Sequence, residues 1–173
     1  MALRKIICIE DELLRKKSRP VEKFDEKLHK LLDDMAETMY NANGVGLAAP
    51  QVGRNIRMLV MDPAGKDEEK QPRVLINPVL ELSGEDVVSE LEGCLSVPLN
   101  YRADVIRKSR VLLKAMDLDG NSIAEELEGF PAIVVQHEAD HLDGVLFIDR
   151  ISRLRRTLYD SKVKKWLKRK NAA

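Results

Sequence analysis

The chain has 173 residues, a length that suits one compact domain with a sizeable core. Hydrophobic residues make up 44% and charged residues 34%, which is typical of a folded, water-soluble protein and excludes a fibrous or disordered chain. No apolar run is long enough to span a membrane, and the first residues lack the apolar core of a secretory signal. We therefore expect a cytoplasmic protein that makes no membrane contact.

The charges cancel overall but are distributed unevenly along the chain. Basic and acidic residues number 29 each. Residues 151–173 contain nine of the basic residues and one of the acidic residues, so residues 1–150 retain 20 basic and 28 acidic residues. A basic segment attached to an acidic body favours an anionic partner for that segment.

The first predicted element is a helix over residues 25–43. Asp25 is a suitable cap at its start, and Asn43-Gly44 is a suitable end. Apolar side chains recur at helical spacing, which indicates one buried face. These positions are Leu28, Leu31, Leu32, Met35 and Met39.

Short β-like runs follow this helix. They occupy residues 55–62, 73–82 and 110–120, and the last run turns through an Asp-Gly pair into residues 121–129, as in a hairpin. Residues 64–72 are polar and charged, which predicts an exposed loop.

The pattern becomes helical again over residues 130–142, with a proline in the first turn and Gly144 just past the end. A last, basic helix is predicted over residues 152–169, with Leu154, Leu158, Val163 and Leu167 as its apolar positions. Strands mixed with separated helices, without alternating βαβ order, predict an α+β fold. We expect a single domain in which short, mostly antiparallel strands pack around the helix at 130–142.

That central helix contains a possible metal site, because residues 137–141 read H-E-x-x-H. Two histidines four residues apart project from one helix face, where Ile133 and Val134 lie one turn earlier. They are two of only three histidines in the chain, so a metal site is favoured over unrelated histidines on an amphipathic helix. The third, His29, stands among lysines and is expected on the surface.

A third ligand is harder to find downstream of this motif. In the metzincin pattern a histidine would stand where this chain has Phe147, and no glutamate follows Glu138, so Asp149 is the remaining downstream candidate. Upstream, Cys94 is a better one, although a single cysteine is usually a core residue. A thiolate with two imidazoles leaves one coordination position for water, as in catalytic metal sites. The residues therefore favour a metal-activated hydrolase.

Three motifs, taken together and in this order, resemble those of the peptide deformylase family. Residues 44–51 read G-V-G-L-A-A-P-Q, residues 92–96 read E-G-C-L-S, and residues 136–141 read Q-H-E-A-D-H. The resemblance extends from about residue 3 to residue 149. It implies a hydrolase that removes the N-terminal formyl group from formyl-methionyl nascent peptides and releases formate.

The resemblance also implies a set of metal ligands, namely Cys94, His137 and His141. They would hold one divalent ion, Fe²⁺ in the cell, with Zn²⁺, Ni²⁺ or Co²⁺ able to replace it. Such an ion lowers the pKa of bound water from about 15.7 to about 7 and so provides hydroxide at neutral pH. Glu138 would act as general acid and base, taking the water proton and returning it to the departing amine.

Other residues of the motifs acquire roles in the same way. Gln51 and the backbone N–H of Leu95 would donate to the carbonyl oxygen as negative charge develops on it. Gln136 is expected to buttress the site, and Asp140 either orients a ligand, pairs with a nearby basic residue or is an ordinary exposed charge. The residues that would bind the substrate peptide and its methionine side chain are Val45, Gly46, Gly93, Ile133 and Val134.

Within this fold, residues 1–150 would form the catalytic domain and residues 151–173 a basic C-terminal helix. Some members of the family dock on the ribosome through such a helix, so residues 153–170 are expected to contact ribosomal RNA. One domain without an evident sticky segment predicts a monomer. Two alternatives remain open: a peptidase completed by Asp149, and an inactive ribosome-associated protein that keeps the site for structure.

Overall fold

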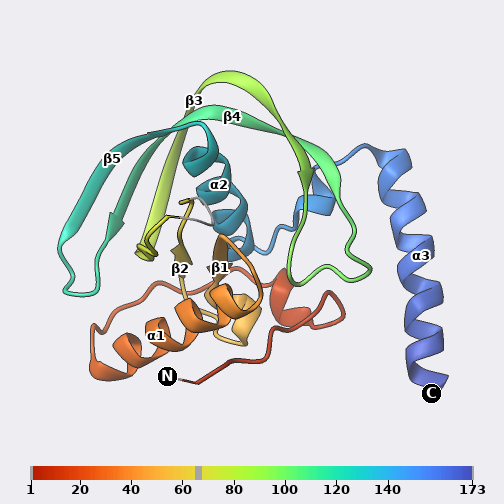
Figure 1. Cartoon of the computed structure of the whole chain (residues 1–173), viewed down its shortest axis with the longest axis horizontal. Coiled ribbons are helices and arrows are strands. Elements are labelled where there is room, and N and C mark those ends of the chain that lie inside the picture. The colour runs from red at the N-terminus through yellow and green to blue at the C-terminus, as the bar shows by residue number, and fades with distance from the viewer. Residues whose placement is uncertain (1, 65–67, 173) are drawn as a thin grey trace.

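The computed structural model describes residues 2–64 and 68–172. Three α-helices and five strands make up most of the described chain, as Figure 1 shows. In chain order they are α1 (Glu26–Asn41), β1 (Gly46–Ala48), β2 (Met58–Met61), β3 (Arg73–Glu92), β4 (Ala103–Met116), β5 (Ser122–Glu128), α2 (Phe130–Leu142) and α3 (Arg153–Ala172).

The strands form one antiparallel sheet in the order β1-β2-β3-β4-β5. The sheet curves over α2, while α1 lies below β1 and β2 (Figure 1). The buried side chains of α2 pack against the inner face of the sheet, which makes α2 the central helix. The fold is therefore α+β and single-domain, as predicted, and the helix with the H-E-x-x-H sequence lies at its centre.

The strands differ in length from the predicted runs. β3 and β4 form one long hairpin whose register shifts three times, between Ile76 and Val79, between Ser83 and Asp86, and between Ser89 and Glu92. Each bulge interrupts the alternation of buried and exposed residues, and most of β3 beyond residue 80 is exposed. For that reason the polar half of the hairpin carried no strand signal.

Both ends of α1 follow the prediction. The Asp25 side chain accepts a hydrogen bond from the backbone N–H of Leu28 at 3.1 Å, and the chain leaves the helix through Asn43, whose φ is 54°. The face formed by Leu28, Leu31, Met35 and Met39 is buried against the other side of β1 and β2. The predicted loop follows β2, but its residues 65–67 lie outside the described chain, and residues 68–72 are exposed.

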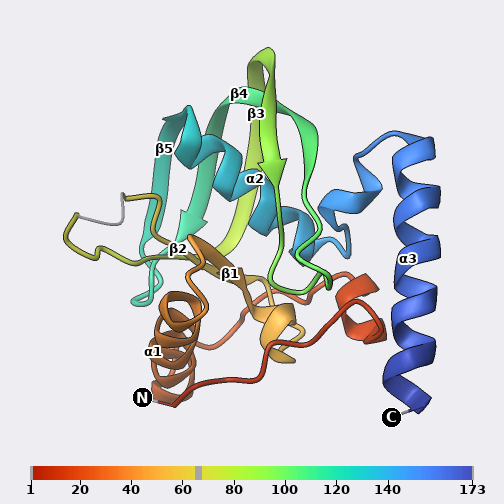
Figure 2. The ribbon, with the colours of Figure 1, turned by 45° about the vertical axis from the view of Figure 1, so that its right-hand side comes forward.

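The C-terminal helix α3 lies at one side of the molecule (Figure 2). Tyr159 and Val163 are buried in a cluster with Phe147 of the body. Of the apolar positions predicted on this helix, Val163 is buried, whereas Leu154 and Leu158 are 71% and 57% exposed. No helix in the described part of the chain combines the length and the apolar character needed to cross a bilayer.

Candidate metal centre and active site

Three metal-binding side chains converge between α2 and the β3–β4 hairpin. His137 and His141 stand one turn apart on α2, and Cys94 lies two residues beyond the end of β3. One ligand atom from each lies within 4.8 Å of the others, and Cys94 Sγ is 3.3 Å from His141 Nε2. Asp149, the rival ligand, is instead held by Arg15, at 2.5 Å, and by Arg156. The structure therefore brings the upstream cysteine to the histidines.

The donor set fits a divalent transition metal. A thiolate with two imidazoles is a ligand set of the catalytic type, and softer ligands of this kind favour Zn, Fe, Ni or Co over Mg or Ca. Burial holds the pKa of His141 well below its ordinary value, so its ring is neutral, as a metal ligand must be. His141 is 1% exposed, so its ring is shielded from bulk water.

An outer carboxylate orients the His137 ring. His137 Nδ1 donates to Glu92 Oε1 at 2.7 Å, which leaves Nε2 free to face the ion. Burial acts to raise the pKa of Glu92, but hydrogen bonds from His137 and Arg107 outweigh it and hold the pKa at about 2. Metal-ligating histidines commonly have such a carboxylate partner, which fixes the tautomer and the ring orientation.

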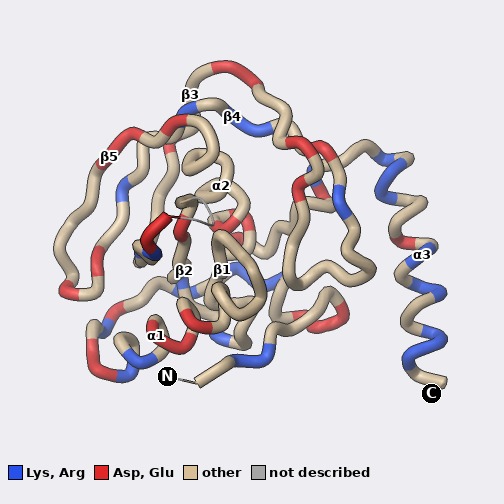
Figure 3. Tube along the Cα trace, viewed as in Figure 1, with Lys and Arg blue, Asp and Glu red and all other residues tan. Residues whose placement is uncertain are grey.

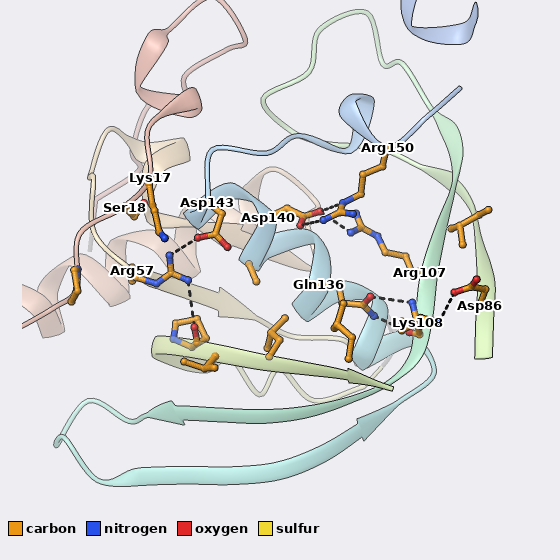
Figure 4. Close-up of a pocket in the computed structure, with 17 residues that line it drawn as sticks. Lys17, Ser18, Arg57, Asp86, Arg107, Lys108, Gln136, Asp140, Asp143 and Arg150 are labelled. Carbon is orange, nitrogen blue, oxygen red and sulfur yellow. Dashed lines mark hydrogen bonds and ion pairs between the residues drawn. The ribbon is translucent and has the colours of Figure 1, made fainter. Parts of the chain in front are cut away.

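Arg107 joins this carboxylate to the far side of α2. Its Nε donates to Glu92 Oε2 at 3.2 Å and its Nη1 to Asp140 Oδ2 at 2.7 Å, while Arg150 donates two further bonds to Asp140, each at 2.6 Å. The bonds from Arg107 and Arg150 to Asp140 appear in Figure 4, which draws the residues that line a groove beside α2. Asp140 is therefore not an ordinary exposed charge, because it is linked to His137 through two ion pairs.

Sequence reasoning missed both Glu92 and Arg107 as functional residues. Glu92 was counted only as the first letter of a motif. Arg107 had a signal of its own, because Ala103, Val105 and Arg107 alternate on the inward face of β4, where an arginine requires buried acceptors. Gln136 is a buttress, as expected: it accepts from the N–H of Lys108 at 3.1 Å and donates to the Lys108 carbonyl at 2.8 Å.

Replacing Arg107 with glutamine should lower the free energy of unfolding and also weaken metal binding. The change leaves Glu92 buried without its cation, which typically costs about 3–5 kcal/mol of unfolding free energy. Loss of an outer-shell partner also typically lowers metal affinity by about 10–100-fold. Urea unfolding and a metal titration measure the two effects. Arg110→Gln, at an exposed ion pair of the same strand, is the control, and equal behaviour of the two variants would contradict the role of Arg107.

Glu138 lies beside the metal ligands and points into a cavity of about 460 Å³. It is 5% exposed, and its Oε2 has no hydrogen-bond partner among the described residues. Burial raises the pKa of Glu138 to about 7. A Cβ atom on Gly46 would lie 2.4 Å from Glu138 Oε1, so only glycine at this position of β1 leaves room for the carboxylate.

Gln51 reaches the same cavity from the 3₁₀ turn that follows β1. Its amide nitrogen donates to Cys94 Sγ at 3.6 Å and to Ser96 Oγ at 3.2 Å, and its Oε1 accepts from the N–H of Ala48 at 2.9 Å. The side chain is 2% exposed and held at both ends. A donor is thus fixed next to a metal ligand, where it can face a substrate oxygen.

All the residues predicted to bind substrate line this cavity, together with several that were not predicted. Val45 and Gly46 form one wall, Gly93 and Leu95 a second, and Ile133 and Val134 a third. Leu91 and Phe130 are large apolar residues at the mouth, 62% and 51% exposed. They had no sequence signal, because exposed apolar residues at the end of a strand or helix are common. The further lining residues include Tyr101 and Arg102.

The chain is similar to known deformylases along nearly its whole length. The sequence model of the family described as polypeptide deformylase matches residues 3–157. A peptide deformylase of Maricaulis maris is 48% identical over 171 residues, covering 99% of this chain and 98% of that protein. One of Caulobacter vibrioides is 49% identical over 169 residues, covering 95% and 97%.

Solved structures agree with these sequence relatives. The crystal structure of a peptide deformylase from Legionella pneumophila is similar with a TM-score of 0.87 and 44% identity, covering 99% of this chain and 98% of that one. The enzyme from Thermotoga maritima gives a TM-score of 0.82 and 46% identity, with coverage of 88% and 99%.

Proposed function

The chain belongs to the peptide deformylase family and removes the N-formyl group from its substrate. We propose that Cys94, His137 and His141 hold one divalent ion for this reaction and that Glu138 acts as general acid and base. The observation that carries this assignment is the convergence of three motifs on one cavity. The ligand atoms lie within 4.8 Å of one another, and Glu138 lines the same cavity as two of the three ligands.

The proposed division of labour follows from the contacts. A divalent ion at this site would supply Lewis-acid polarisation of a carbonyl and would acidify a bound water. Among the described residues nothing competes for a hydrogen bond with Glu138 Oε2, so Glu138 can take a proton from the attacking water and deliver it to the amine nitrogen as the C–N bond breaks. The amide of Gln51 and the N–H of Leu95 donate to the formyl oxygen as negative charge develops there.

Substrate recognition would combine backbone pairing with an apolar pocket. Val45, Gly46 and Gly93 offer backbone groups to an extended peptide, and neither glycine carries a side chain that would block its approach. Ile133 and Val134 of α2 supply the apolar wall for the methionine side chain, with Val45 opposite. We place the reaction in the cytoplasm and expect a monomer, with Fe²⁺ in the cell and Zn²⁺, Ni²⁺ or Co²⁺ as substitutes.

The assay that tests this function compares two substrates of the same sequence. Protein prepared without oxygen, with its metal content measured, is given a short peptide with an N-terminal formyl-methionine, or the same peptide with acetyl-methionine. Formate release from the first, with the internal peptide bonds intact, supports deformylation. Cleavage of internal bonds would favour a peptidase, and bound metal without formate would favour an inactive protein.

We also propose that residues 1–150 are the catalytic part and that α3, within residues 151–173, docks on the ribosome near the emerging peptide. Several exposed cations of α3 have no acidic partner among the described residues, and Leu154 and Leu158 are exposed a turn apart beside them. Phosphate groups of ribosomal RNA would attract the cations, and the two leucines could contact a protein. Five of these unpaired, exposed cations lie in the second half of the helix, namely Lys162, Lys164, Lys165, Lys168 and Arg169.

Neutralising these five cations with glutamine should greatly reduce cosedimentation with ribosomes at low salt. The five changes leave Tyr159 and Val163 packed against the body, whereas a deletion of α3 would remove both residues. Removing several phosphate contacts lowers affinity and flattens its salt dependence. The control preserves the charge at the same five positions: each lysine is replaced by arginine, and Arg169 is replaced by lysine. Undiminished cosedimentation of the glutamine variant would rule out docking through the charges of α3.

A further inference from the structure

A second basic surface lies on the body, at the start of α1 and away from the catalytic cavity. It is a groove of about 760 Å³ between residues 19–23, the first half of α1 and Arg54. Its lining includes two acidic residues, Glu22 and Asp25, and a larger set of basic ones. The basic lining residues are Arg4, Arg19, Lys23, Lys27, Lys30 and Arg54.

Most of these cations are not neutralised by a neighbour. Arg4 and Lys30 share Asp34, at 2.7 Å and 3.6 Å. Within residues 2–64 and 68–172, no carboxylate lies within ion-pair distance of the other four, which are all exposed: Arg19, Lys23, Lys27 and Arg54. Residues 1–150 carry 28 acidic and 20 basic residues, so an unpaired cluster of this kind stands out from an otherwise acidic body.

The frame that carries the cations is fixed by backbone contacts. The N–H of Arg19 donates to the carbonyl of Asn55 at 3.2 Å, and the carbonyl of Arg19 accepts from the N–H of Arg57 at 2.8 Å. Two residues on, Val21 exchanges a pair of hydrogen bonds with the Asn77 side chain, at 2.8 and 2.9 Å. The charges therefore project from ordered backbone rather than from a free tail.

We propose that this groove binds the phosphate backbone of RNA, as a second contact separate from α3. The cations are spread along an open groove and none of its charged lining residues is buried, which suits an extended polyanion better than a small ion. Its apolar lining residues Val21, Leu28 and Leu31 are buried, whereas a membrane-binding surface would expose such side chains beside its cations. In Figure 3 the basic residues of α1 lie at the lower left of the molecule, whereas those of α3 lie along its right-hand edge.

The test uses the full chain and a labelled RNA duplex of arbitrary sequence, and it does not depend on deformylase activity. The variant Arg19→Gln, Lys23→Gln, Lys27→Gln, Arg54→Gln should bind at least about tenfold more weakly at low salt, and the slope of log K against log salt should fall by about two to four. The matched control makes the same change in net charge on the sheet, by replacing Arg73, Lys108, Arg110 and Lys114 with glutamine. It should bind the RNA duplex as tightly as the unaltered chain does.

Several results would overturn the assignment. Equal binding by the groove variant and the sheet control would mean that the groove is only a solvated charged surface. Loss of binding to vesicles containing phosphatidylserine, with RNA binding unchanged, would indicate a membrane partner instead. If the fourfold variant does not fold, judged by circular dichroism, the two pairs Lys23→Gln, Lys27→Gln and Arg19→Gln, Arg54→Gln should each account for about half of the loss in slope.

Discussion

Replacing Cys94 by serine should abolish stable metal binding and, with it, formate release. The change removes the thiolate, the ligand that lies 3.3 Å from His141 Nε2, and leaves two imidazoles that cannot complete a catalytic site. Because loss of an outer-shell partner alone typically costs about 10–100-fold in metal affinity, loss of the ligand should cost more than about 100-fold. A competition titration with a chromogenic chelator measures this, alongside the formate assay.

Cys8→Ser is the matched control, because Cys8 is the other free cysteine and is also half-buried, but it does not line the catalytic cavity. It should keep both metal and activity. A Cys94→Ser protein that retained the ion as tightly as the Cys8→Ser protein would show that residue 94 is not a ligand.

Glu138→Gln should slow formate release by about 10²–10⁴-fold while metal content stays unchanged. The amide keeps the size of the side chain but can neither take a proton from water nor return one to the amine. The effect should fall on kcat, because the carboxylate acts on the reacting atoms rather than on the peptide chain. The unfolding midpoint should not fall, since the buried Oε2 has no hydrogen-bond partner to lose among the described residues.

Glu90→Gln makes the same chemical change at an exposed residue on the rim of the cavity, and its kcat should stay within a few-fold of the unaltered enzyme. Two outcomes would contradict the role of Glu138. One is a Glu138→Gln enzyme of nearly normal rate. The other is a loss of bound metal that matches the loss of rate, which would mean that Glu138 acts by holding the ion.

The metal site could be predicted because most of it is local in sequence. The helical spacing of His137 and His141 follows from 3.6 residues per turn, and the missing downstream ligand directed attention to Cys94. The contacts around the ligands could not be predicted in the same way. The bonds from Glu92 to His137 and to Arg107 depend on how the β3–β4 hairpin folds against α2, and three register shifts in that hairpin have no clear sequence signal.

The fold was predictable where burial is periodic and not elsewhere. The start of α1 at Asp25 and the whole of α2 were confirmed, because both helices bury a continuous face. The apolar positions of α3 do not all face the body: Leu154 and Leu158 are exposed, because the helix is buried only around Tyr159 and Val163. The close packing of Gly46 in β1 against Glu138 had no sequence signal, because it depends on how the strand lies against α2.

The central claim is best tested by X-ray absorption at the edge of the bound metal, on enzyme loaded with Zn²⁺ or Co²⁺. Coordination by one thiolate and two imidazoles predicts a single sulfur scatterer at about 2.3 Å and nitrogen scatterers at about 2.0–2.1 Å. The sulfur signal should remain in Cys8→Ser. A spectrum with only nitrogen and oxygen neighbours in the unaltered enzyme would contradict a site built from Cys94, His137 and His141.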